Sequence, residues 1–214
     1  MSAAPPGLVV DDLARRYGRR WAVARVSFAV EPGTACQVVG PNGSGKSTLL
    51  RCLATALPAN HGTARLDGQE LWTHRRSLRK QVAFLSHASR LYEDLSARDN
   101  VAVWARLGGY PTRQDALIER VGLEPDRSDP VHSFSAGMRR RLALAIALMK
   151  KPRMLLLDEP FAALDPQGRE LVLDIVRDVR DAGAVVLMAT HLPEQAAHVC
   201  SQTIRLEAGR RVHA

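Results

Sequence analysis

Glycine, lysine and hydroxyl residues occur together in one stretch of the chain, at the spacing G-x-x-x-x-G-K-S. The stretch reads Gly40, Pro41, Asn42, Gly43, Ser44, Gly45, Lys46, Ser47 and Thr48. Glycines let several backbone N–H groups approach a phosphate closely, and the N-terminus of a following helix adds partial positive charge. Lys46 can then reach the β- and γ-phosphates, and the Ser47 hydroxyl can ligate Mg²⁺. An ordinary Gly/Ser turn is the alternative, but the apolar strand predicted at 34–39 and the apolar helix predicted from about Lys46 favour a nucleoside triphosphate site.

Two carboxylates, Asp158 and Glu159, follow an apolar run at 154–157 that predicts a buried strand. A Mg²⁺-nucleotide site needs such a carboxylate at the tip of a second strand, and Asp158 can hold the metal directly or through water. Glu159 can polarise the water that attacks the γ-phosphorus. An acidic turn after a core strand is the alternative for these residues in isolation. Their combination with the glycine-rich loop favours catalysis.

The elements that must position these residues follow an α/β pattern. Strands are predicted at 8–10, 26–30, 35–39, 64–66, 154–157 and 184–189, the early ones partly antiparallel and the last two buried. Helices are predicted at 97–107, 113–121, 135–149 and 167–182. The stretch from about 87 to 149 reads as an inserted helical subdomain. A strand, helix and strand that follow a phosphate loop predict a mainly parallel core.

The composition is typical of a globular α/β protein. The 214 residues suffice for one large domain or one domain with a subdomain, and no apolar run approaches the ~20 residues that span a bilayer. Residues 1–7 lack the pattern of a secretion signal, so we expect a short flexible tail and a cytosolic location. Cys36, Cys52 and Cys200 are isolated in apolar contexts, which indicates buried thiols.

Basic residues give the chain a formal net charge of +8. Such an excess agrees with nucleic acid or an anionic membrane surface as a neighbour, although nucleotide-binding proteins also carry extra Lys and Arg. The arginine runs lie at 15–16, 19–20, 75–76, 139–141 and 210–211. They lack the interleaved aromatic residues that stack on bases, so we expect solvated faces and no nucleic-acid partner.

Further positions resemble the nucleotide-binding subunit of an ATP-binding cassette (ABC) transporter, and the resemblance covers nearly the whole chain. Tyr17 corresponds to the aromatic residue that stacks on adenine in this family. Ser135 and Gly137 fall at the family's signature loop, and Asp165 falls at the loop that crosses between paired subunits. His191 resembles the switch histidine that senses the γ-phosphate.

The resemblance implies an α/β fold with a P-loop NTPase core of the ABC type, an N-terminal antiparallel β subdomain and an inserted helical subdomain. It implies a single domain at 8–214, with the helical subdomain at about 88–150. ATP and Mg²⁺ are the implied cofactors, and ATP hydrolysis is the implied activity. Ser135 and Gly137 would cap the γ-phosphate bound by a second copy, so a homodimer with two competent sites is expected. An integral membrane permease is the implied partner, on the cytoplasmic face of the bacterial inner membrane.

Two departures from the family pattern narrow the subfamily. Ala136 and Met138 replace the third and fifth residues of the usual signature, and the loss of a polar side chain at Met138 either alters coupling or is a tolerated surface change. His87 stands where the family usually has a glutamine that contacts Mg²⁺ or the attacking water, and imidazole can also accept from water or approach a metal. The stretch around His87 is similar to heme-exporter subunits of cytochrome c biogenesis, whereas residues 137–141 equally resemble drug and lipid exporters. A short helix of the membrane partner is expected to dock between His87 and Asn100.

Two other classes of protein match parts of the sequence. A soluble ABC protein acting on nucleic acid or the ribosome agrees with the positive charge, but such proteins usually carry two cassettes or a long coiled-coil insertion, and this chain has neither. A small-molecule kinase or GTPase with the same loop would leave the signature and His191 unexplained.

Overall fold

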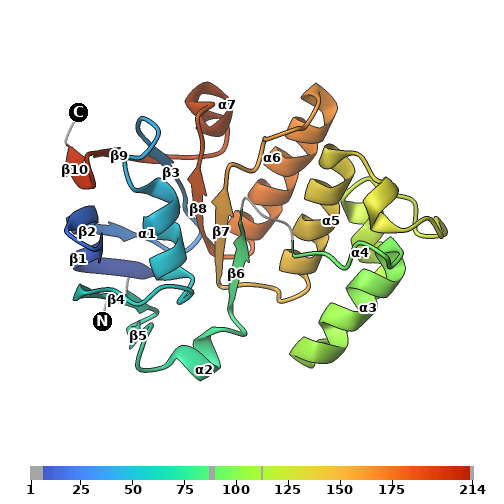
Figure 1. Cartoon of the computed structure of the whole chain (residues 1–214), viewed down its shortest axis with the longest axis horizontal. Coiled ribbons are helices and arrows are strands. Elements are labelled where there is room, and N and C mark those ends of the chain that lie inside the picture. Colours follow the sequence, from blue (N-terminus) through green and yellow to red (C-terminus); the bar gives the residue numbers. More distant parts are fainter. Residues whose placement is uncertain (1–6, 87–89, 112, 213–214) are drawn as a thin grey trace.

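Two β-sheets and a group of helices make up the computed structural model, which describes residues 7–86, 90–111 and 113–212 (Figure 1). The larger sheet has the order β10-β9-β3-β8-β7-β6 and is parallel except for the antiparallel β9–β10 pair. Its strands are β3 (Ala35–Val39), β6 (Val82–Leu85), β7 (Met154–Asp158), β8 (Val185–Ala189), β9 (Gln202–Glu207) and β10 (Arg210–Val212). The smaller sheet has the order β2-β1-β4-β5 and is antiparallel. Its strands are β1 (Leu8–Tyr17), β2 (Arg20–Val30), β4 (His61–Leu66) and β5 (Gln69–Glu70).

The helices cover both faces of the larger sheet. They are α1 (Lys46–Leu53), α2 (Arg75–Leu78), α3 (Ala97–Gly108), α4 (Gln114–Arg120), α5 (Ala136–Leu148), α6 (Pro166–Asp181) and α7 (Pro193–Ala197), with a 3₁₀ turn η1 (Val131–Ser133). Helix α1 lies on the side that carries the small sheet, whereas α5 and α6 lie on the other side (Figure 1). Within the described ranges, no helix combines the length and the apolar character needed to cross a bilayer.

Alternate residues of the central strands face two different cores. Every residue of β3, β7 and β8 is buried. On β7, Leu155 and Leu157 belong to the core with α5 and α6, whereas Met154 and Leu156 belong to the core with α1 and the small sheet. Continuous apolar runs are typical of parallel strands covered on both faces. The prediction of a mainly parallel α/β core is confirmed.

Helices α3, α4 and α5 form the helical group that follows β6. The Ser96 hydroxyl caps α3 by accepting from the Asp99 N–H at 3.1 Å, and Gly109 ends the helix with a φ of 66°. Asn100 is fully buried and exchanges two hydrogen bonds with the Tyr92 backbone, accepting from its N–H at 2.8 Å and donating to its carbonyl at 2.9 Å. These contacts fix the segment that enters the helical group. Both the antiparallel sheet and the helical insert of the predicted fold are therefore present.

The observed elements differ from the predicted ones mainly at the N-terminal sheet. Strands β1 and β2 have 10 and 11 residues, far longer than the predicted 8–10 and 26–30. Irregular pairing interrupts their alternation of apolar and polar residues, with φ values of 50° at Asp12 and 56° at Arg25. The short or weakly patterned elements β5, β9, β10, α2 and α7 had no clear sequence signal. Gly7, predicted to lie in a flexible tail, is buried and accepts a hydrogen bond from the Asp67 N–H at 2.8 Å; residues 1–6 lie outside the described part of the chain.

The arginine run at 139–141 is not the solvated face that the sequence predicts. Arg140 is only 7% exposed. Arg139 donates to the Phe134 carbonyl at 2.8 Å, and Arg141 donates to the Gly122 carbonyl at 2.7 Å. Successive helical residues point about 100° apart, so three neighbouring arginines reach three different segments. Part of the positive charge therefore supports the fold.

The cysteine thiols are shielded from solvent to different degrees. Cys36 and Cys52 are buried, as predicted, whereas Cys200 is half-buried. Burial raises the pKa of Cys36 to about 12 and that of Cys52 to about 11. Both thiols are therefore protonated near neutral pH, which disfavours thiolate chemistry.

Candidate functional site

Strand order brings three distant parts of the sequence to one edge of the larger sheet. Strand β8 lies between β3 and β7, and the three strands are parallel. The glycine-rich loop follows β3, Asp158 and Glu159 close β7, and Thr190 and His191 follow β8. Their functional side chains therefore meet at the carboxyl ends of the strands, the usual position of ligand sites in such sheets.

The glycine-rich loop curls around the N-terminus of α1. Lys46 is 7% exposed, and its ammonium donates to the Gly40 carbonyl at 2.8 Å and to the Pro41 carbonyl at 3.2 Å. The lysine charge is thus held inside the loop by weak neutral acceptors. A phosphate oxygen is a stronger acceptor for an ammonium group than a carbonyl, so Lys46 can transfer to phosphate without losing a salt bridge.

Two glycines of the loop sit against neighbouring backbone. Gly40 has a φ of 147° and Gly45 a φ of 106°, both in the region that disfavours side chains. A Cβ on Gly45 would overlap the carbonyl oxygen of Ala22, and one on Gly40 would overlap that of Leu206. Only glycine allows the loop to pack this closely against β2 and β9.

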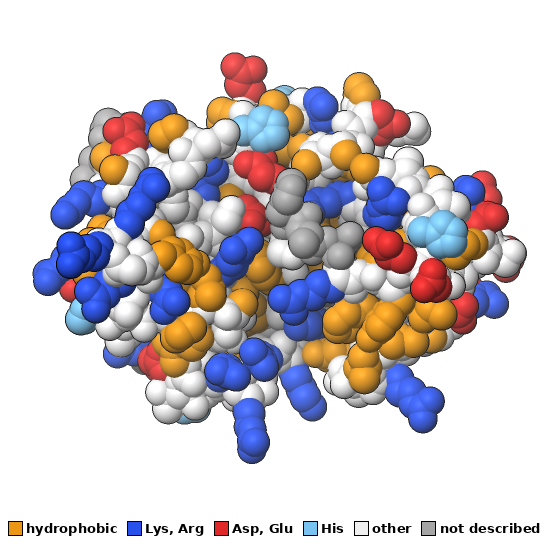
Figure 2. All heavy atoms as spheres, in the orientation of Figure 1, with side chains coloured by type: hydrophobic (Ala, Val, Ile, Leu, Met, Phe, Trp, Pro, Cys, Tyr) orange, Lys and Arg blue, Asp and Glu red, His pale blue; other side chains and the backbone are white. Residues whose placement is uncertain are grey.

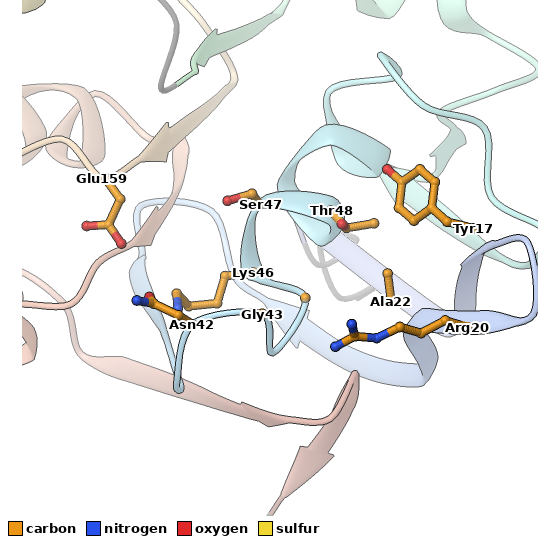
Figure 3. Close-up of a pocket in the computed structure, with 10 residues that line it drawn as sticks. Tyr17, Arg20, Ala22, Asn42, Gly43, Lys46, Ser47, Thr48 and Glu159 are labelled. Atoms are coloured by element: carbon orange, nitrogen blue, oxygen red, sulfur yellow. The ribbon is translucent and has the colours of Figure 1, made fainter.

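A cavity of about 510 Å³ opens over this loop. Its lining comprises Tyr17, Arg20, Ala22, Asn42, Gly43, Gly45, Lys46, Ser47, Thr48 and Glu159. Figure 3 shows Tyr17, Ala22 and Arg20 at one end and Glu159 at the other, with Lys46 between them. Tyr17 is 47% exposed, so its ring is available for stacking on a base. The cavity therefore has an aromatic end and a charged end, as a nucleoside triphosphate requires.

A buried hydroxyl in the loop is further evidence for a nucleotide at this site. Ser44 is 2% exposed, and its Oγ has no hydrogen-bond partner among the described residues. Buried polar atoms without partners are uncommon and call for an explanation. The loop's polar groups, the open cavity and the nearby lysine together fit the phosphates of a nucleotide.

The candidate Mg²⁺ ligands are in direct contact. Ser47 is the second residue of α1, and its hydroxyl donates a hydrogen bond to Asp158 Oδ1 at 2.9 Å. Asp158 is 2% exposed, whereas Ser47 lines the cavity. A hydroxyl and a carboxylate are hard oxygen donors, and Mg²⁺ typically takes one or two such protein ligands together with phosphates and waters. These residues therefore fit Mg²⁺.

Hydrogen bonds to its side chain and its backbone hold Glu159 just after β7. Its Oε2 lies 2.7 Å from the His191 Nδ1 and accepts from the His191 backbone N–H at 3.2 Å. Its own N–H donates to the Ala189 carbonyl at 2.8 Å. Among the described residues Oε1 has no hydrogen-bond partner, and Glu159 lines the cavity. One carboxylate oxygen is thus oriented by His191, and the other is available to a water molecule.

The signature residues lie outside the lining of this cavity. Ser135 caps α5 by accepting from the Met138 N–H at 3.1 Å, and Asp165 caps α6 by accepting from the Gly168 N–H at 2.7 Å. A Cβ on Gly137 would lie 2.9 Å from the Ala163 carbonyl oxygen, so the two loops pack closely. Met138 is half-buried and packs against the core that contains α5 and α6, which explains an apolar residue at this position. The predicted roles of Ser135, Gly137 and Asp165 require a second copy of the chain, and His87 lies outside the described residues.

The sequence pattern does not predict the positions of two residues near the site. The arginine run at 19–20 predicts a solvated face, yet Arg20 lines the cavity beside Gly43. Its position three residues after Tyr17, across a tight turn, was the available signal. The run at 139–141 likewise predicts a solvated face, and only the fold reveals that Arg140 is buried behind the carboxylates.

The fold and the arrangement of these residues define a P-loop NTPase of the ATP-binding cassette type. The chain belongs to the ABC transporter family, whose model matches residues 23–162. A solved structure of an ATP-binding subunit of an ABC transporter is similar over 95% of this chain and 87% of its own length, with a TM-score of 0.86 and 27% identity. A dimeric ATP-binding cassette in a post-hydrolysis state with ADP and Pi shares the fold, with a TM-score of 0.86 and 22% identity over 96% of this chain and 97% of its own.

Curated relatives are similar over almost all of this chain. Nod factor export ATP-binding protein I of Ralstonia nicotianae is 34% identical over 212 residues, which cover 97% of this chain and 66% of that protein. Daunorubicin resistance ATP-binding protein DrrA3 of Streptomyces coeruleorubidus is 35% identical over 97% of this chain and 67% of its own length. Linearmycin resistance ATP-binding protein LnrL of Bacillus subtilis is 28% identical over 96% of this chain and 68% of its own length. The chain thus spans about two thirds of the length of these relatives.

We expect Arg20→Ala to weaken ATP binding about threefold to tenfold, because an exposed cation that lines the cavity beside Gly43 contributes a modest charge-assisted interaction with the nucleotide. Arg19→Ala is the matched control: it removes the same charge from the same turn but from a residue outside the cavity lining. Titration with a fluorescent ATP analogue measures both. Equal affinities of the two variants would contradict a specific contact by Arg20.

Proposed function

We propose that this chain is the ATP-hydrolysing subunit of an ABC exporter, which binds Mg²⁺-ATP and drives a membrane permease. The observation that carries the proposal is the meeting of two residue pairs over one phosphate-binding loop. Ser47 and Asp158 form the pair suited to Mg²⁺, and Glu159 and His191 form the pair suited to water activation. The experiment that tests it is ATP turnover by the purified chain, with release of phosphate as the readout.

The hydrolytic step assigns a distinct task to each side chain. Lys46 leaves the loop carbonyls and binds the phosphates, which neutralises charge as the γ-phosphoryl group transfers. Glu159 orients the attacking water through Oε1 and accepts its proton. His191 keeps the carboxylate in place through Oε2 and can donate to the γ-phosphate. Mg²⁺, when held by Ser47 and Asp158, would supply charge stabilisation on the phosphate oxygens.

We further infer that the active form is a homodimer. Ser135 and Gly137 open α5, and neither lines the cavity of its own chain. A helix N-terminus is a favourable site for an anion, and the family resemblance assigns this one to the γ-phosphate of the second copy. Two ATP molecules would then hold two chains together, and hydrolysis would release them.

The permease partner is expected at a groove of about 430 Å³ between the larger sheet and the helical group. Its apolar lining includes Phe84, Leu91, Trp104 and Ile146, and it overlaps the segment 87–100 predicted for docking. Among the described residues that line it, Arg79, Arg90 and Lys150 are the cations and none is acidic. Figure 2 shows Lys and Arg side chains gathered between the regions of β6 and α3, beside a hydrophobic patch over α3. We therefore expect an amphipathic permease segment with acidic side chains, at the cytoplasmic face of a bacterial inner membrane.

Charge reversal tests this partner surface. The double variant Arg79→Glu and Arg90→Glu should lower co-purification of the permease about tenfold, because complementary charges would become repulsive. Arg76→Glu is the matched control. Arg76 lies in helix α2, which ends immediately before Arg79, but it does not line the groove. Equal recovery of the permease with both variants would contradict docking at this groove.

The cargo we propose is a drug-like or lipid-like molecule. The names of the relatives, which refer to Nod factor export and to resistance against daunorubicin and linearmycin, support this class. Heme export is the second candidate: it depends on the stretch around His87, and these relatives do not support it. Loss of the gene distinguishes the two, since heme export predicts loss of covalent heme attachment to cytochromes c, whereas drug export predicts increased drug sensitivity.

A further inference from the structure

Arg140 connects helix α5 to the ends of two strands. Its Nη1 donates to the Ser86 carbonyl, at 2.6 Å, just after β6. Its Nη2 donates to the carbonyls of Asp158 and Glu159 at the end of β7, the latter at 2.8 Å. One guanidinium group thus connects helix α5, the residue after β6, and the backbone carbonyls of Asp158 and Glu159.

Burial makes this arrangement costly for a residue with only a packing role. Arg140 is 7% exposed, and desolvation lowers the pKa of its guanidinium, although the nearby charges of Asp158 and Glu159 oppose this. Its Nε has no partner among the described residues. A buried arginine is tolerated when its remaining donors are well used. Here they are used on the carbonyls next to the reacting carboxylate.

The backbone of Glu159 needs such external support. Its φ is 55°, a left-handed conformation that is unfavourable for a non-glycine residue and persists only where the surroundings impose it. The Ala189 carbonyl holds the Glu159 N–H, and the Glu159 carbonyl accepts from Arg140 at 2.8 Å and from the Ala162 N–H at 3.1 Å. Together they determine the direction in which the side chain leaves the strand. His191 then fixes the carboxylate itself.

We propose that Arg140 is a positioning residue, which sets the Glu159 carboxylate and ties its position to the orientation of helix α5. This inference rests on the proposed ATPase function. Because Ser135 caps α5 and Gly137 lies in its first turn, a rotation of this helix would be transmitted through Arg140 to Glu159. The contact offers a direct route between the signature end of α5 and the hydrolytic group of the same chain.

Arg140→Gln tests the inference. It should lower kcat about tenfold to a hundredfold, since small displacements of a reacting group have effects of this size, while ATP affinity stays within about twofold because Arg140 does not line the cavity. Arg140→Lys should recover part of kcat by keeping one charged donor. Arg141→Gln is the matched control, because it also removes a bond to a backbone carbonyl, that of Gly122, from the same helix but away from the site.

The outcomes separate positioning from stability. Both Gln variants are expected to unfold at lower temperature, so kcat is measured well below either Tm and normalised to nucleotide-binding sites. Arg140→Gln with the kcat of wild type, or with the same loss as Arg141→Gln, would overturn the positioning role. Absence of ATP turnover in the wild-type dimer would instead overturn the proposed function.

Discussion

Glu159→Gln should lower kcat for ATP hydrolysis by about 10²–10⁴-fold, the range that a positioned general base contributes. The amide cannot accept a proton from water, but it retains the size of the carboxylate and can still accept from His191 through its oxygen. ATP affinity should change little, since Lys46, Ser47 and the loop backbone are untouched. Phosphate release and binding of a fluorescent ATP analogue measure the two quantities.

The same variant should accumulate as an ATP-bound dimer, because hydrolysis no longer separates the two copies. Size-exclusion chromatography with and without ATP detects this shift. Glu194→Gln is the control, as Glu194 is an exposed glutamate in the first turn of α7 and outside the cavity lining. A full hydrolysis rate in Glu159→Gln would refute the assigned role. A monomer in the presence of ATP would refute the dimer.

Gly45→Ala should abolish measurable ATP binding and lower the free energy of unfolding by about 2–5 kcal/mol. The new methyl group would overlap the Ala22 carbonyl oxygen, and the φ of 106° is unfavourable for alanine. Overpacking in a tight site typically costs 1–3 kcal/mol, and the left-handed backbone adds roughly 1–2 kcal/mol. Relief of the overlap must shift the loop, which displaces the backbone N–H groups from the phosphates.

Gly18→Ala is the matched control for Gly45→Ala. Gly18 has a φ of 56°, and a Cβ there would meet nothing within 4 Å. It therefore carries only the backbone cost, about 1–2 kcal/mol. Urea unfolding and nucleotide titration should separate the two variants. Equal effects would show that close approach to β2 is not what the loop requires at Gly45.

Local features of the chain were predictable because adjacent residues determine them. The helix that starts at Lys46 and the strand that ends at Asp158 were placed within a residue or two, since apolar periodicity and capping chemistry are local. The predicted helix at 167–182 is observed as Pro166–Asp181, started by the Asp165 cap. By contrast, β9 was missed, because its six residues alternate between exposed and buried and give only a weak signal. It is nevertheless the neighbour of β3.

The sequence by itself determined the phosphate loop, the paired carboxylates and the class of chemistry, since each depends on residue types at short fixed spacing. The roles assigned to these residues remain predictions that the variants above test. Only the tertiary structure decided that β8 lies between β3 and β7, which brings His191 within 2.7 Å of Glu159 although 32 residues separate them. It also decided that Arg140 is buried behind the carboxylates and that Arg20 reaches the cavity. The physical reason is that the direction and burial of a side chain depend on which elements pack against its own, and residue spacing carries no such information.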